Sequence, residues 1–164
     1  KDLAGELTDR VAVLAEKTQD IHQLLVRELG LKPTGEPSPD SGIRVAYHDP
    51  CHLRKSLGVV TEPRDVIRAV SGHRLVEMAE SDACCGMGGS FNLKYYGISS
   101  RIGRLKRDHI QATGCRVVAT GCPACMLQIS DVLSKSGDRI SVRHPVEIYA
   151  EALKKEEANI RGVA

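Results

Sequence analysis

The sequence has no tryptophan, one phenylalanine and four tyrosines. So few aromatic rings argue against a stacking surface for single-stranded nucleic acid. The net charge of +2 is also too small to indicate a polyanionic partner, so we expect no nucleic acid to bind. The chain contains no apolar run of about eighteen or more residues, and we therefore expect no transmembrane segment.

The first residues do not have the pattern of a leader sequence. The first residue is lysine rather than methionine, and the residues after it resemble neither a signal nor a transit peptide. We therefore expect an excised or processed piece of a longer polypeptide, located in the cytoplasm. At 164 residues the chain can form a core without disulfides. Paired cysteines in such a chain favour metal or redox chemistry in a reduced compartment.

Composition divides the chain into three segments. Apolar residues at three-, four- and seven-residue steps predict an amphipathic helix or helix pair over residues 1–31, which ends near Gly30. We expect this segment to pack on the domain or on the remainder of the parent chain. Three prolines predict a linker over residues 32–42. Residues 43–164 are predicted to form the cysteine-rich main domain.

Strand-like and helix-like segments alternate within the main domain. The expected strands are Ile43–Tyr47, Arg74–Met78, Arg116–Thr120 and Ile140–Arg143. The expected helices are Pro63–Val70, Ser99–Thr113, Met126–Ser134 and Val146–Lys155. This order predicts an α/β fold, in which helices flank a small parallel β-sheet of about four strands.

Five of the six cysteines form the pattern Cys51-x32-Cys84-Cys85-Gly86-x35-Cys122-x2-Cys125. Each group of cysteines follows a predicted strand, and the carboxyl ends of parallel strands share one edge of a sheet, so the three groups can converge there. Five thiolates exceed the four that one tetrahedral zinc ion or one cubane iron–sulfur cluster takes. The pattern therefore predicts a centre with more than one metal ion.

The Cys122-x2-Cys125 pair taken alone is equally typical of a thioredoxin-like redox dithiol at the start of a helix. The other three cysteines, which have no role in such a site, favour the metal centre. The sixth cysteine, Cys115, precedes a predicted strand, and we expect it to pack at the opposite edge of the sheet.

Three glycines follow the vicinal cysteines. Gly86, Gly88 and Gly89 allow the backbone to approach a bulky centre and to present N–H groups to sulfur. The stretch matches neither of the common phosphate-binding glycine patterns. These glycines are therefore predicted to surround the same centre as the cysteines.

Several charged or ionisable side chains lie near the predicted site. Whether His48, His52 or His144 ligates a metal, carries a proton or bonds a loop carbonyl stays open. We expect His144 at the same sheet edge as the cysteines. We expect a solvated face for the basic residues Lys94, Arg101, Arg104, Lys106 and Arg107.

The sequence motifs around the cysteines resemble those of a known family. His48-Asp49-Pro50-Cys51-His52-Leu53, Cys84-Cys85-Gly86-Met87-Gly88-Gly89-Ser90-Phe91 and Gly121-Cys122-Pro123-Ala124-Cys125 resemble the cysteine-rich CCG domain. That domain occurs in heterodisulfide reductase subunits, in the iron–sulfur subunit of glycolate oxidase and in lactate-utilisation proteins. The similarity runs from about Ile43 to Leu153 and is greatest to the glycolate and lactate branch. The chain is identified as the C-terminal CCG domain of such an iron–sulfur subunit.

The resemblance implies a cofactor and partners. In heterodisulfide reductases the motif holds a non-cubane four-iron cluster, so the implied 4Fe–4S ligands are Cys51, Cys84, Cys85, Cys122 and Cys125. The implied function is electron transfer in a 2-hydroxy-acid oxidoreductase, from an FAD-containing dehydrogenase subunit toward a quinone or another acceptor. The remaining part of the parent subunit is a further implied partner. Partners could also attach the protein to the membrane periphery, and the fragment alone should turn over no substrate.

Two alternatives remain. The domain could carry out thiol–disulfide redox chemistry in the manner of heterodisulfide reductase, or it could hold structural zinc as an assembly module. We also expect the isolated domain to lose its cluster readily, or to take up zinc in its place.

Overall fold

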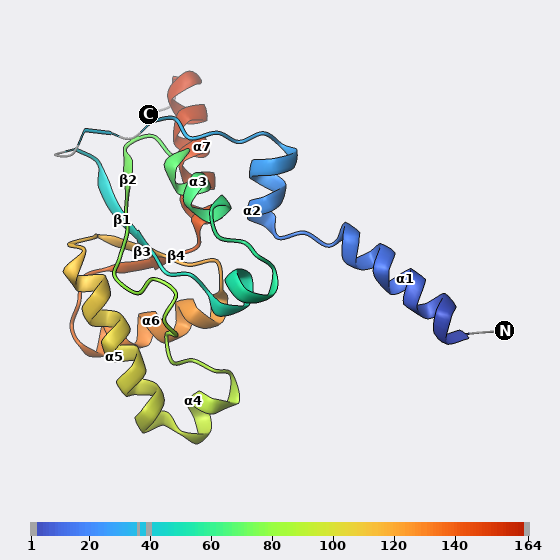
Figure 1. Ribbon diagram of the computed structural model, residues 1–164. Coiled ribbons are helices and arrows are strands. Elements are labelled where there is room, and N and C mark those ends of the chain that lie inside the picture. The colour runs from blue at the N-terminus through green and yellow to red at the C-terminus, as the bar shows by residue number, and fades with distance from the viewer. Residues whose placement is uncertain (1–2, 36, 39–40, 163–164) are drawn as a thin grey trace.

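The computed structural model describes residues 3–35, 37–38 and 41–162. Its centre is a parallel four-stranded sheet in the order β2-β1-β3-β4 (Figure 1). The strands are β1 (Ile43–Tyr47), β2 (His73–Val76), β3 (Val117–Ala119) and β4 (Ser141–Arg143). The predicted α/β class and parallel sheet are thereby confirmed.

The register brings the ends of the strands together. β1 pairs with β2 from Ile43 opposite His73, and with β3 from Val45 opposite Val117. β3 in turn pairs with β4 from Val117 opposite Ser141. All carboxyl ends therefore point to one edge. Because the chain leaves β1 for one side of the sheet and β3 for the other, the gap between these two strands is the point where the strand order reverses.

Four helices cover the two faces of the sheet, as parallel strands require. One face packs on α5 (Tyr96–Ala112) and α6 (Pro123–Lys135), where fully buried Ala46 and Val118 meet Ile110 and Ile129. The other face packs on α3 (Glu62–Arg68) and α7 (Pro145–Ile160), where buried Val45, Tyr47 and Ala119 meet Ile67 and Ile148. Alternate residues along β1 and β3 thus serve opposite cores.

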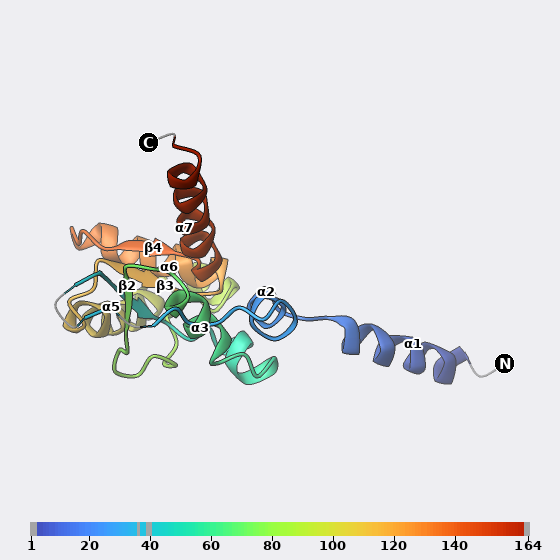
Figure 2. The same cartoon turned by 90° about the horizontal axis from the view of Figure 1, so that it is seen from above.

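The N-terminal segment is a helix pair. α1 (Leu3–Lys17) projects away from the body in both views, with Leu7, Val11 and Leu14 exposed (Figures 1 and 2). Of the two expected positions, α1 therefore does not pack on the domain, and packing on the remainder of the parent chain stays a prediction. After a break comes α2 (Ile21–Gln23), whose N-cap is Asp20; the Asp20 side chain accepts a hydrogen bond from the His22 N–H. α2 continues as the wide helical turn η1 (Leu24–Glu28).

The second part of the pair does pack on the domain. His22 is completely buried, and Arg27 donates to the buried Glu62 of α3 from Nε to Oε1 at 2.8 Å. Gly30 follows in the left-handed region with φ of 68°, as expected near a helix end. The predicted linker over residues 32–42 lies partly outside the described residues.

Two short helices were not predicted. The turn η2 (His52–Ser56) follows Cys51 directly, and α4 (Ser90–Lys94) follows the glycines. Neither is long enough to show a helical period in sequence. The strand predicted over Arg74–Met78 is shifted toward the N-terminus, since β2 begins at His73 and ends at Val76. In the described part of the chain, no helix is both long and apolar enough to cross a membrane.

Candidate metal centre

The cysteines gather at the carboxyl edge of the sheet, beside the point where the strand order reverses. Cys51 lies in the loop after β1 and starts η2, while Cys122 lies after β3 and starts α6. Cys125 lies in the first turn of α6, and the vicinal pair lies in the loop after β2. Ligands in open parallel sheets usually bind at such a crevice.

One cavity of about 180 Å³ opens between these loops. It is lined by His48, Cys51, His52, Cys84, Cys85, Met87, Gly88, Gly89, Cys122, Ala124 and Cys125. A water molecule occupies about 30 Å³ in the liquid, so the cavity has room for a group much larger than one ion. All five cysteines of the sequence pattern contribute to its lining.

The cavity has a buried and an exposed side. Cys85, Cys122 and Cys125 are buried, whereas Cys51 and Cys84 are exposed free thiols. A group held between them would lie against the start of α6 and would face solvent across the two exposed thiols. Such an arrangement suits electron exchange with a partner, because the exposed side leaves a short path to the surface.

Gly86 lies behind the cavity and shapes the cysteine loop. Its φ is 93°, a conformation that favours glycine, and a Cβ at this position would lie 2.5 Å from the backbone oxygen of Ser99. The Gly86 N–H donates to the Cys84 Sγ at 3.2 Å, and the Ser99 hydroxyl donates to the Gly86 oxygen at 2.7 Å. The loop is therefore held against α5, and one N–H already points to sulfur.

The crowded thiols are poor acids while no metal is bound. The contact with Cys85, together with burial, raises the pKa of Cys84. The contact with Cys125 and burial raise the pKa of Cys85 to about 11. A redox dithiol of the thioredoxin type needs a lowered thiol pKa, which the vicinal pair lacks. A metal that displaces these protons would stabilise the thiolates instead.

A buried cation lies behind the same loop. Lys106 of α5 is 1% exposed, and its Nζ donates to the backbone oxygens of Glu80 and Ser81. Burial lowers the pKa of Lys106, and the negative charge of a Cys85 thiolate opposes that shift. The expected solvated position for Lys106 is wrong. A buried charge without a partner is costly, so a buried ammonium near thiolates compensates their negative charge while they compensate its positive charge.

His48 is buried at the end of β1, and its Nδ1 lies 3.0 Å from the backbone oxygen of Ser81. Burial, together with the charge of Lys106, lowers the pKa of His48 to about 4. A ring nitrogen of His48 and the Sγ atoms of Cys85 and Cys125 all lie within 4.8 Å of one another. In the portion of the chain that the structure describes, no other such group of three potential metal ligands converges.

Beside His48, Asp49 pairs with Arg64 of α3 and also joins two cysteine loops through Ser81. Asp49 is 1% exposed and accepts from Arg64 Nη1 and Nη2 at 2.7 and 2.8 Å. The Ser81 hydroxyl donates to Asp49 at 2.7 Å, and the Asp49 N–H donates to the Ser81 oxygen at 3.0 Å. Burial raises the pKa of Asp49, but the hydrogen bonds from Arg64 and Ser81 outweigh burial and hold it below its usual value.

His144 and Cys115 both lie away from the cavity, as was expected for Cys115. His144 caps α7, where its Nδ1 accepts from the Val146 N–H at 3.2 Å, and its ring stacks on His22 at 5.0 Å. It is at the expected sheet edge but does not line the cavity. Cys115 is buried before β3 at the opposite edge, and its thiol contacts the Ile110 oxygen, as a packing residue would.

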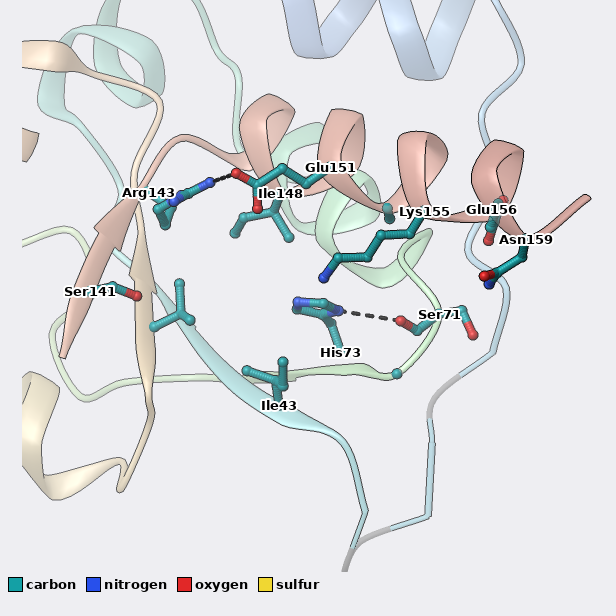
Figure 3. A pocket seen from close by; sticks show the side chains of 13 residues that line it. Ile43, Ser71, His73, Ser141, Arg143, Ile148, Glu151, Lys155, Glu156 and Asn159 are labelled. Atoms are coloured by element: carbon teal, nitrogen blue, oxygen red, sulfur yellow. Dashed lines mark hydrogen bonds and ion pairs between the residues drawn. The ribbon is translucent and has the colours of Figure 1, made fainter. Parts of the chain in front are cut away.

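A larger cavity of about 500 Å³ lies between the starts of the strands and α7 (Figure 3). Two of its polar side chains have partners within the chain, since Arg143 pairs with Glu151 and His73 Nδ1 lies 3.3 Å from the Ser71 oxygen. No cysteine lines this cavity. We therefore assign the site to the smaller, cysteine-lined cavity.

Comparison with known proteins gives the family. The model of the cysteine-rich domain called CCG matches residues 45–130, which include all five cysteines of the pattern. The chain belongs to this family. Its match covers β1 through most of α6, so the matched residues contain the whole cysteine-lined cavity of this CCG domain.

Relatives of this CCG domain include proteins of lactate utilisation. It is 32% identical to the uncharacterized protein YkgE of Escherichia coli K12 over 87% of the chain and 59% of the relative. It is 34% identical to lactate utilization protein A of Oceanobacillus iheyensis over 82% of the chain and 54% of the relative. The chain thus spans little more than half the length of these relatives.

A third relative is named as part of a reductase. The chain is 40% identical to one subunit of the fumarate reductase (CoM/CoB) of Methanothermobacter marburgensis, over 58% of the chain and 19% of the relative. Family and relatives together support a metal-binding redox role. The donor set agrees with that role, because soft thiolates favour iron–sulfur clusters and zinc over magnesium or calcium.

Proposed function

We propose that the cavity holds a four-iron iron–sulfur cluster through Cys51, Cys84, Cys85, Cys122 and Cys125. The observation that carries the proposal is the convergence of these five thiols on one cavity of about 180 Å³. One metal ion would need four ligands around one point, whereas five thiols around a larger space suit several metal ions. The cluster supplies one-electron transfer when bound.

The protein part has three tasks in this proposal. The loops after β1, β2 and β3 bring the thiols together. The hydrogen bonds between Asp49 and Ser81 fix the first two loops relative to each other, and Arg64 of α3 holds Asp49 in place. The start of α6 and the cysteine loop, which is held against α5, cover the buried side. Lys106 compensates thiolate charge from behind the cysteine loop, which would help to retain an anionic cluster.

We further propose that the domain passes electrons within a multi-subunit 2-hydroxy-acid oxidoreductase. The names of several relatives, lactate utilization protein A among them, support lactate or the similar glycolate as the substrate of the complete enzyme. A flavin subunit would supply the electrons and a quinone or another acceptor would receive them. The proposed location is the cytoplasm, with attachment to the membrane through partners.

Metal analysis tests the proposal. Protein purified or reconstituted without oxygen should contain about four iron and four acid-labile sulfide per chain. Cys84→Ser and Cys85→Ser should each lower the iron content strongly. Cys115→Ser is the matched control, because Cys115 is also buried but lies at the opposite edge of the sheet. Equal iron loss in the control would contradict the assignment of the ligands.

A structural zinc site is the second candidate. The close group of His48, Cys85 and Cys125 favours it, because nitrogen and sulfur ligands suit zinc. Zinc at about one per chain, with iron and sulfide never retained, would establish this candidate. The raised pKa of Cys84 and of Cys85 speaks against a free redox dithiol at the vicinal pair. Disulfide cleavage by the loaded centre is a separate alternative, and reaction of the loaded domain with a small disulfide would establish it.

A further inference from the structure

His48 has an unusually fixed position for a loop histidine. It follows the last residue of β1, and its N–H donates to the Ala119 oxygen at 2.9 Å, which extends the pairing of β1 with β3. The side chain is 1% exposed and lines the cysteine cavity. The backbone thus places the ring at the floor of the site, three residues before Cys51.

The hydrogen bonds of the ring fix its tautomer. Nδ1 lies 3.0 Å from the Ser81 oxygen, and a carbonyl oxygen can only accept, so Nδ1 carries the proton. Nε2 is then left with a lone pair. This atom is buried and has no hydrogen-bond partner among the described residues. Buried polar atoms without partners are rare, and each one requires an explanation.

The surroundings limit what the Nε2 lone pair can bind. A ring nitrogen of His48 lies within 4.8 Å of the Sγ atoms of Cys85 and Cys125. Once these thiols are deprotonated, neither sulfur can donate a hydrogen bond to Nε2. Nε2 cannot donate one to a thiolate or sulfide either, because it has no proton. A metal ion is the partner that suits a bare imidazole nitrogen between two thiolates.

We propose that His48 binds, through Nε2, one metal ion of the group that the cysteines hold, beside Cys85 and Cys125. This inference rests on the proposed function and adds a nitrogen ligand to its five sulfur ligands. The bond from Nδ1 to Ser81 supplies the outer partner that metal-binding histidines usually have. A neutral imidazole on an otherwise thiolate-bound iron also raises the reduction potential of the group.

The test uses the whole chain, loaded with iron without oxygen and prepared with ¹⁵N-labelled or unlabelled histidine. Electron–nuclear double resonance of the paramagnetic state should show a strongly coupled nitrogen that changes with the isotope. The coupling should disappear in His48→Ala. His52→Ala is the matched control, since His52 lines the same cavity and is exposed, and it should keep the coupling. Loss of iron from His48→Ala to a chelator should be about ten- to a hundredfold faster.

The outcomes separate the two proposals. Wild-type protein with about four iron but without an isotope-sensitive nitrogen would overturn the role of His48 and leave the cluster proposal intact. A coupling lost in His52→Ala and kept in His48→Ala would overturn it as well. Wild-type protein that never retains iron would overturn both proposals. If His48→Ala does not fold, a nitrogen coupling present in both the wild type and His52→Ala still assigns the ligand to His48. His48 and His52 are the two of the six histidines that line the cavity.

Discussion

At Gly86 the cysteine loop passes close to the backbone of α5. We expect Gly86→Ala to destabilise the metal-free protein by about 2–4 kcal/mol, because it combines a strained φ with a 2.5 Å clash against backbone. Gly89→Ala is the control in the same loop. Its φ of 57° with ψ of −119° also disfavours a Cβ, but nothing lies within 4 Å of the added atom, so a smaller loss of about 1–2 kcal/mol is expected. Urea unfolding under reducing conditions measures both, and equal losses would contradict the close approach at Gly86.

Asp49 should make the free energy of unfolding depend on pH in the acidic range. Its pKa is lowered in the folded state, so its contribution is complete above the unfolded value of about 3.9 and is lost as pH falls through the folded value. At neutral pH, Asp49→Asn should cost about 3 kcal/mol, the low end for breaking a buried pair, because Arg64 keeps Glu77.

The measurement is chemical unfolding of metal-free protein between pH 7 and pH 3. The difference between wild type and Asp49→Asn should shrink below about pH 4. Asp65→Asn is the control, since the pair of Asp65 with Arg68 is partly exposed and should be worth less than about 1 kcal/mol. A difference that is constant with pH would show that the Asp49 carboxylate is not the stabilising group.

At the scale of single residues, the sequence predicts the cysteines of the site but not the side chains that surround and support them. The cysteines were predictable because the chemistry is carried by residue type and spacing. The roles of Asp49 and Arg64 come from contacts between distant segments, which no local pattern reports. Lys106 did have a signal. It stands four residues after Ile102 and four before Ile110, on the apolar face of α5, and a lysine in such a stripe is not solvated.

Among the elements, α2 is the one whose role the sequence understates. His22 packs against Gly121, where an added Cβ would lie 2.9 Å from His22 Cε1 and 2.6 Å from Leu53 Cδ1. Gly121 directly precedes Cys122, and Leu53 lies just after Cys51. The N-terminal segment therefore supports two cysteine loops from outside the matched family region. We propose that the domain proper includes α2 and η1, in addition to residues 43–164.

Two truncations test this division. Removal of residues 1–17 should leave stability unchanged, because the apolar side chains of α1 that the structure describes are exposed. Removal of residues 1–31 should cost about 2–5 kcal/mol, because it uncovers the contacts of His22 and leaves Glu62 without Arg27. The readout is the urea midpoint of each variant. Equal stability of both truncated proteins would exclude a supporting role for α2.

The longer helices were predictable because each spans enough turns to show the spacing of apolar residues that is typical of a helix. α5, α6 and α7 each show an apolar stripe, and the strands are short runs rich in valine and isoleucine. The order β2-β1-β3-β4 was not predicted, since it depends on which strands pair and not on any one segment. That order is what places Cys51 and Cys122 next to each other across the reversal point.

For the molecule as a whole, the fold should not depend on the metal centre. Each face of the sheet has its own core of buried aliphatic side chains, and Cys85, Cys122, Cys125 and the partly buried Met87 extend one core into the site. We therefore expect metal-free and loaded protein to give the same far-ultraviolet circular dichroism. This behaviour differs from that of zinc fingers, which are unfolded without metal.

Loading should instead stabilise the molecule by mass action. Binding at a hundred times the dissociation constant adds about 2.7 kcal/mol, which for this chain length raises the melting temperature by about 5–10 °C. Slower hydrogen exchange should be confined to the loops after β1, β2 and β3, because these carry the thiols while the cores are already packed. Protection spread evenly over the sheet, or loss of helical signal on metal removal, would show instead that the centre is part of the folding core.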